Sequence, residues 1–140
     1  MNKTQLKIHY LLIIVFFSIN SFSEENKKNF ISIEADKLIT WQNPLKSEFI
    51  GNVYAIDQEN FFWGDKMIIN YDDKKKIELI KLEKNVKVKR INEEATGNYA
   101  YYNPKSEIIE LIGNIIVFKD KNVLYGEKLT IDLKSSTSII

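Results

Sequence analysis

The sequence has 140 residues, which is room for one domain with or without a targeting segment. Its 20 Lys and Arg against 19 Asp and Glu give a net charge of +1, which argues against a dedicated nucleic-acid binder. The absence of cysteine excludes disulfide scaffolds, cysteine-ligated zinc and thiol catalysis, and the only histidine is His9.

The N-terminal 23 residues differ in kind from the rest of the chain. Residues 1–9 carry two lysines and no acid, residues 10–19 are almost wholly apolar, and a polar run begins at Glu24. This pattern predicts a cleavable signal peptide over 1–23 with cleavage near Ser23, and hence export. An exported protein without cysteine is more typical of a bacterial periplasm than of an animal extracellular space. An uncleaved anchor is the alternative, but the apolar stretch is about half of the ~20 residues that a spanning helix needs.

The predicted mature chain divides into three parts. Residues 24–30 are expected to be a flexible lead-in, 31–133 the folded domain, and 134–140 a frayed tail or an edge that awaits a partner. Removal of the signal peptide takes away two lysines and the histidine, so the charge of the remainder stays close to neutral. A core of this size can hold itself together without disulfides.

Two short phrases repeat at fixed offsets within this domain. Gly-Asn-Val at 51–53 recurs as Lys-Asn-Val at 84–86 and as Gly-Asn-Ile at 113–115. Each copy is followed, 13 residues after its first residue, by the glycine of a second phrase. These glycines are Gly64, Gly97 and Gly126, and a further copy of the second phrase stands at 34–38. Such regular spacing indicates a repeated structural unit.

The repeated unit is predicted to be β. Segments 36–41, 67–71 and 129–133 are short, rich in β-branched and aromatic residues, and bounded by turn-formers. Turn chemistry separates the segments at 57–60, 72–74, 92–94, 103–105 and 119–122. No apolar stripe with helical spacing is present after residue 23. We expect roughly three strands per unit in an antiparallel or meandering all-β stack.

Alternation along these strands predicts one continuous apolar face. The residues expected on it are Phe49, Val53, Ala55, Ile80, Leu82, Val86, Val88, Ile109, Leu111, Ile115 and Val117, with Met67, Ile69, Leu129 and Ile131 from the other strand of each unit. Such a face is either an ordinary core or, if two layers are held slightly apart, a groove for an oily ligand.

The residues typical of catalysis are scarce. Without histidine or cysteine, Ser-His and Cys-His arrangements are excluded after residue 23, and only oxygen ligands remain for a metal. The acidic pairs at 72–73 and 93–94 are predicted to be solvated turn residues, although a carboxylate-pair hydrolase stays open by residue type. We therefore expect no catalytic residue, no metal and no cofactor.

Other conspicuous side chains have ordinary interpretations. The basic runs at 74–76 and 87–90 are expected to be solvated faces, with contact to a phosphate-bearing glycolipid as the less favoured alternative. Trp41 and Trp63 are more typical of core or sheet-edge packing than of a ligand platform.

The order of the repeated phrases resembles the LptA/OstA-like family of periplasmic lipopolysaccharide transport proteins. The matching words are Ile-Glu-Ala-Asp-Lys-Leu, Phe-Ile-Gly-Asn-Val, Gly-Asp-Lys-Met-Ile-Ile-Asn-Tyr, Glu-Leu-Ile-Gly-Asn-Ile and Tyr-Gly-Glu-Lys-Leu-Thr-Ile, which start at residues 33, 49, 64, 110 and 125. The resemblance covers about 31–133. The chain is short for such a protein, so we expect fewer strands.

This resemblance implies an open, taco-like antiparallel β-jellyroll that carries the acyl chains of lipopolysaccharide against its apolar face. It also implies head-to-tail self-association and a bridge between an LptC-like inner-membrane protein and an LptD-like outer-membrane protein. Two alternatives remain: an inner-membrane-anchored LptC-like subunit of the same system, and a dry-cored structural β-repeat module without a lipid ligand.

Overall fold

The computed structural model describes residues 31–140 as nine strands in one sheet. The signal peptide and lead-in predicted for 1–30 lie outside the described residues. The strands are β1 (Ile31–Glu34), β2 (Lys37–Gln42), β3 (Leu45–Asp57), β4 (Asn60–Tyr71), β5 (Ile77–Arg90), β6 (Glu93–Asn103), β7 (Ile108–Lys119), β8 (Asn122–Asp132) and β9 (Thr137–Ile139). No helix in this part of the chain is long and apolar enough to cross a membrane.

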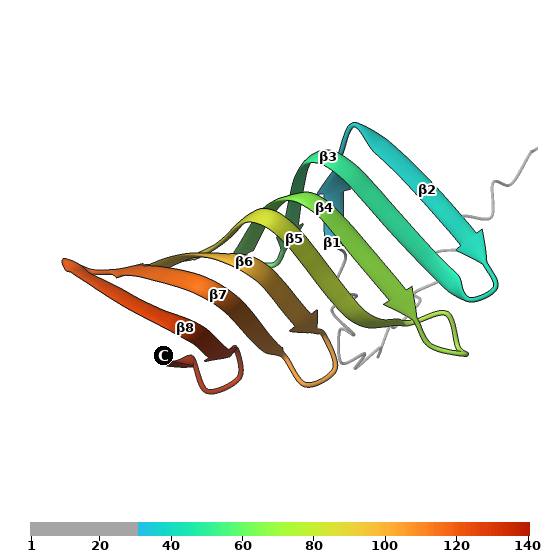
Figure 1. The fold of residues 1–140 in the computed structure, drawn as a ribbon. Helices are drawn as coiled ribbons and strands as arrows, with labels where there is room; N and C mark the ends of the chain where they lie inside the picture. Colours follow the sequence, from blue (N-terminus) through green and yellow to red (C-terminus); the bar gives the residue numbers. More distant parts are fainter. Residues whose placement is uncertain (1–30) are drawn as a thin grey trace, which may run out of the picture.

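The sheet is an antiparallel meander. Each strand from β3 to β8 pairs with the next one along the chain, while β1 and β2 both pair with β3. Figure 1 shows the long strands arching side by side, with β2 at one end of the sheet and β8 at the other. The fold is therefore an open antiparallel β-jellyroll, as the sequence predicts.

A line of β-bulges crosses the middle of the sheet. The register of every long strand pair shifts by one residue there, because two residues of one strand face a single residue of its neighbour. The doubled residues are those of the first repeated phrase, and all six have positive φ: Gly51, Asn52, Lys84, Asn85, Gly113 and Asn114. The strand structure is interrupted between β1 and β2 on the same line, at residues 35–36.

At two of these bulges an aspartate of the second repeated phrase bonds to the asparagine of the first. The Asn52 side chain donates to Asp36 over 2.9 Å, and the Asn85 side chain donates to Asp65 over 2.8 Å. The two repeated phrases thus lie side by side at the bulges. Each repeat consists of two long, bent strands rather than the three short strands expected, because the chain continues as a strand through the bulge.

The bulge line divides the sheet into two halves. Half A comprises β1 and segments 53–57, 60–64, 86–90, 93–97, 115–119 and 122–126. Half B comprises β2, β9 and segments 45–50, 66–71, 77–83, 99–103, 108–112 and 128–132. The inner faces of the two halves pack on each other and enclose the hydrophobic core.

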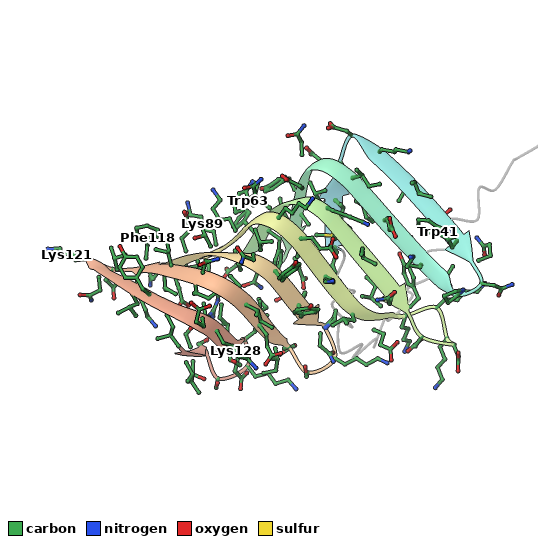
Figure 2. All side chains as sticks on the ribbon, viewed as in Figure 1. Trp41, Trp63, Lys89, Phe118, Lys121 and Lys128 are labelled. Atoms are coloured by element: carbon green, nitrogen blue, oxygen red, sulfur yellow. The ribbon has the colours of Figure 1, made fainter. Side chains whose placement is uncertain are left out.

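The outer face carries the remaining side chains of the long strands. Figure 2 shows Trp63, Lys89 and Phe118 projecting from half A, and Lys128 on half B. On half B the charges are paired: Glu48 accepts from both Lys46 and Lys66, and Lys128 lies 2.6 Å from Glu110. These exposed pairs favour solubility more than stability.

The C-terminal segment ends in a short strand at one edge of the sheet. Residues 137–139 form β9, which pairs with residues 130–132 of β8. Asp132 caps the intervening turn by accepting hydrogen bonds from the backbone N–H groups of Lys134 and Ser135. Its carboxylate thus stabilises the turn that leads into β9.

Candidate functional site

The inner face is the candidate functional site. All fifteen residues predicted for the apolar face lie on it, and fourteen of them are at most 3% exposed. Phe49, the exception, is half-buried and packs against the core. On β3, β5 and β7 the bulge does not flip the alternation, because its two residues leave positions such as Phe49 and Val53 on the same face. On β4 the partner positions Gly64 and Met67 are three residues apart, so the alternation shifts there by one residue.

Four further buried apolar residues of the inner face were not predicted from the sequence. They are Phe62, Ala95, Ala100 and Tyr102, each at most 3% exposed. Their signal was present, because Ala100 stands three residues after Gly97, as Met67 stands three after Gly64. Tyr102 likewise occupies the position of Ile69. The alanines carry little hydrophobic signal on their own, so that only alignment of the glycines finds them.

The interior between the halves is nearly filled. Within the part of the chain that the structure describes, the cavity among its apolar side chains measures about 10 Å³ and is lined by residues of both halves. Phe62 of half A stacks on Tyr102 of half B with ring centroids 5.6 Å apart. In this closed arrangement the apolar face has the packing of a protein core, which leaves no room for a ligand.

Two hydrogen bonds to buried carboxylates join the halves. The Tyr102 hydroxyl of half B donates to Asp57 of half A over 2.5 Å, and the Ser138 hydroxyl of β9 donates to Glu93 of half A over 2.8 Å. Burial, and then the hydrogen bond to Asp57, raise the pKa of Tyr102 well above its ordinary value. Tyr102 therefore remains a neutral donor across the physiological pH range.

The position of Glu93 differs from the one expected from the sequence. It was predicted to be a solvated turn acid, but it is the first residue of β6 and is 8% exposed. Its outward neighbour Glu94 is half-buried and lies on the other face of the sheet. Glu93 is buried because strand alternation turns its side chain inward, where Arg90 and Ser138 surround it. Asp72, of the other acidic pair, does lie in a turn.

The tryptophans lie outside the core. Trp63 is on the outer face of half A, where the Lys87 ammonium group sits 4.2 Å from its ring centre. Trp41 is exposed on the edge strand β2, with the ammonium group of Lys46 4.4 Å from its ring centre. Both are sheet-surface residues with a cation–π partner. The lysines at 74–76 are exposed, as predicted for a solvated face.

The sheet has two free edges. At one edge β2 exposes 55% of Leu38, and at the other the half-A part of β8 exposes 42% of Leu124. Because β9 pairs only with residues 130–132, residues 122–126 lack a strand partner on their outer side among the described residues. Unpaired backbone groups at such edges favour the addition of another strand.

A single antiparallel sheet, folded along a line of bulges around an apolar inner face, defines the open β-jellyroll class. Residues 32–137 match the family described as "LptA/(LptD N-terminal domain) LPS transport protein", and the chain therefore belongs to this family. No curated protein sequence matches the chain significantly.

A solved structure with the same fold supports this assignment. It is the crystal structure of LptH, described as the LptA homologous periplasmic component of the conserved lipopolysaccharide transport device from Pseudomonas aeruginosa. It superposes with a TM-score of 0.72 at 16% identity over 79% of this chain and 81% of that chain. At this identity the likeness establishes the fold.

Proposed function

We propose that this protein carries lipopolysaccharide through the periplasm by holding the acyl chains of the glycolipid against its inner face. The observation that carries the proposal is the large apolar cluster to which both halves contribute. Membership of a lipopolysaccharide transport family supports it. The fifteen predicted residues would then line the groove. No catalytic group or cofactor is required for passive carriage.

Lipid uptake requires the halves to separate. Each methylene of an acyl chain that leaves water contributes about 0.8 kcal/mol, so a chain of ordinary length can take over the apolar packing that the inner faces provide each other in the closed form. The direct hydrogen bonds that must open are Tyr102 to Asp57 and Ser138 to Glu93. The bulge line is the natural hinge, because its residues already interrupt the regular ladder.

The free edges suggest how the protein takes part in a bridge. An open-ended sheet can add a strand of a similar domain at each edge, and a contact between unlike edges need not close on itself. We propose an LptC-like inner-membrane protein at one end, an LptD-like outer-membrane protein at the other, and head-to-tail self-association between them. A signal peptide cleaved near Ser23 would deliver the chain to this compartment.

The near absence of space inside the fold favours a second candidate. A cavity of about 10 Å³ is compatible with a dry-cored structural module that never opens. That module would use its edges for assembly and would bind no lipid. The two candidates differ in whether the inner face meets glycolipid in cells.

Site-specific photo-cross-linking in cells tests the proposal. Probes at Phe49 and Leu124 sit on the inner face at positions that are not fully buried, so they avoid disruption of the core. Matched probes at Ile50 and Lys128 sit on the outer face of half B. We expect lipopolysaccharide adducts at Phe49 and Leu124 and none at the two controls.

The alternative outcomes are separable. Adducts at the outer positions alone would retain lipid binding but reject the inner face as its site. No adduct at any position, in a variant that is exported and folded, would favour the dry-cored module.

A further inference from the structure

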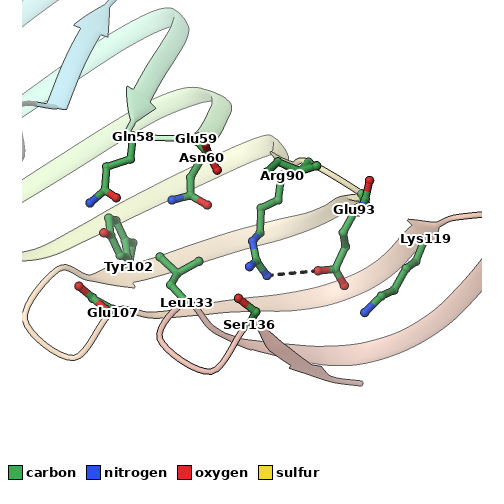
Figure 3. A pocket seen from close by; sticks show the side chains of 12 residues that line it. Gln58, Glu59, Asn60, Arg90, Glu93, Tyr102, Glu107, Lys119, Leu133 and Ser136 are labelled. Carbon is green, nitrogen blue, oxygen red and sulfur yellow. Dashed lines mark hydrogen bonds and ion pairs between the residues drawn. The ribbon is translucent and has the colours of Figure 1, made fainter.

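A polar cavity of about 430 Å³ lies at the mouth of the fold, where the tips of half A approach the turns of half B. Figure 3 shows this cavity, with Gln58, Asn60 and Arg90 on one side and Glu107, Leu133 and Ser136 on the other. It is separate from the small apolar void within the core. None of the residues that line this cavity belongs to either repeated phrase, so the cavity is not a consequence of the bulges.

The Glu93 side chain, which lines this cavity, is buried with one oxygen unpaired. Glu93 is 8% exposed, and its Oε2 accepts from Ser138 over 2.8 Å and from Arg90 over 3.5 Å. Its other oxygen, Oε1, is buried and has no hydrogen-bond partner within residues 31–140. Glu93 lines the cavity, but its Oε1 is inaccessible to water in the closed form. Buried polar atoms are nearly always paired, so this oxygen is a candidate acceptor for a donor that arrives when the halves separate.

The chemistry of the walls limits which donor fits. The cavity is lined by three carboxylates and two cations, and amide and hydroxyl groups supply most of the remaining polar lining. Lys119 makes no ion pair within the described chain, whereas Arg90 is held by Glu93. The excess of carboxylates disfavours a phosphate group. It favours a neutral ligand with many hydroxyl or amide N–H donors, which is the chemistry of a sugar.

The cavity is also contiguous with the apolar interior. Tyr102 and Leu133 line it, and both also contact the core: Tyr102 stacks on Phe62, and Leu133 packs against the buried cluster. An amphiphile with its tails between the halves would therefore emerge here. We propose that this mouth binds the hydroxyl-rich carbohydrate part of the carried glycolipid, with Glu93 Oε1 accepting from a sugar hydroxyl or amide. This inference rests on the proposed function.

The test compares Glu93→Gln with Glu94→Gln in the full mature chain. Glu93→Gln keeps the volume and an acceptor for Ser138 but removes the charged acceptor. Glu94 is the adjacent residue on the outer face, so its variant is a matched control. Two probes are titrated: purified lipopolysaccharide, and a fluorescent fatty acid that has an acyl chain but no sugar. Urea unfolding of both variants confirms that each remains folded.

We expect Glu93→Gln to weaken lipopolysaccharide binding by about tenfold, the effect of one lost hydrogen bond to a charged group. The fatty-acid affinity of Glu93→Gln should not fall, because a weaker contact across the closed mouth does not hinder opening. Both affinities of Glu94→Gln should match those of the wild type. Unchanged lipopolysaccharide binding by Glu93→Gln would overturn the proposal, and so would an equal loss for both probes, which would indicate a structural role. Tighter lipopolysaccharide binding by Glu93→Gln would identify a phosphate at the mouth instead.

The proposed function has its own readout in the same experiment. If the wild type binds neither probe, carriage itself is rejected. If it binds both probes and Glu93→Gln behaves as the control, only the sugar site is rejected.

Discussion

Asp57 and Glu93 bring two carboxyl groups to the junction between the halves, where water is largely excluded. Each keeps one oxygen in a hydrogen bond across the fold, to Tyr102 and Ser138 respectively. A buried carboxylate is costly unless its oxygens are satisfied. The hydroxyl groups of Tyr102 and Ser138 therefore stabilise the closed form mainly by making this burial tolerable.

Removal of the Tyr102 hydroxyl should reveal this dependence. We expect Tyr102→Phe to lower the free energy of unfolding by about 1–3 kcal/mol, because the Asp57 carboxylate is left buried without its donor. Urea titration measures the change. Tyr101→Phe is the matched control, since Tyr101 lies on the outer face and no hydrogen bond of its hydroxyl is present within the described residues. Equal stability of the two variants would contradict the role assigned to Tyr102.

Asp72 provides a pH-dependent contribution at the surface. The hydrogen bond from Lys105, followed by those from the backbone N–H groups of Lys76 and Lys74, lowers the pKa of Asp72 from 3.8 to about 2. A lowered folded-state pKa stabilises the protein above the unfolded pKa, and this contribution is lost as the pH falls through about 2.

The Asp72→Asn variant should therefore be less stable than the wild type at pH 7, and the difference should shrink between pH 4 and pH 2. Urea unfolding at several pH values measures both curves. Asp73→Asn is the control, because Asp73 is an exposed neighbour outside the Lys105 pair. A stability difference that stays constant down to pH 2 would disprove the assignment.

At the scale of elements, the bulge determines both the bend and the repeated phrases. Gly51 and Gly113 have φ near +82°, and a Cβ at Gly51 would lie 2.5 Å from an Asp36 oxygen. The left-handed backbone favours glycine there, and a larger residue would also displace the Asp36 side chain. Lys84 occupies the equivalent position of β5 with φ +59°, a conformation that costs an L-residue about 1–2 kcal/mol.

Lys84→Gly should therefore stabilise the protein. Relief of the left-handed strain outweighs the greater entropy of glycine in the unfolded chain, so we expect a gain of about 0.5–1 kcal/mol. Thermal unfolding measures the gain as a higher Tm. Lys89→Gly, at an extended position of the same strand, should instead destabilise the protein. A loss of stability in both variants would mean that Lys84 is not strained.

The bulged strands also explain how much of the fold and of the inner face could be predicted from the sequence. Alternation placed Val53, Leu82 and Leu111 on one face because strand periodicity continues across a two-residue bulge. It did not find Ala100 or the burial of Glu93, since alanine gives a weak apolar signal and a carboxylate gives the wrong one. Closure of the two halves depends on contacts between distant strands, such as Phe62 with Tyr102, which local patterns do not encode.

For the molecule as a whole, the central question is whether the halves separate. The closed form buries its inner face as completely as a core, and residues of half A and half B meet directly at Tyr102 and at Glu93. The transport proposed for this face requires that the closed form be one of two accessible states, with lipid favouring the open one. A covalent bridge across the mouth would remove the open state.

The Glu93→Cys/Ser138→Cys variant allows such a bridge, because the chain has no cysteine of its own. These side chains meet across the mouth, so a short bis-methanethiosulfonate cross-linker can join them. We expect the bridged protein to lose binding of a fluorescent fatty acid and to recover it when the linker is cleaved by reduction. Comparison of the bridged and the reduced form of this one variant removes any effect of the two substitutions themselves.

The control places the same bridge within one half. Lys81→Cys/Tyr101→Cys joins neighbouring strands on the outer face of half B, where the two residues are register partners. Its bridged form should bind the fatty acid as well as its reduced form, because the halves can still part. Undiminished binding by the bridged 93/138 protein would show that lipid does not enter between the halves, and the edges of the sheet would then be the place to search for its path.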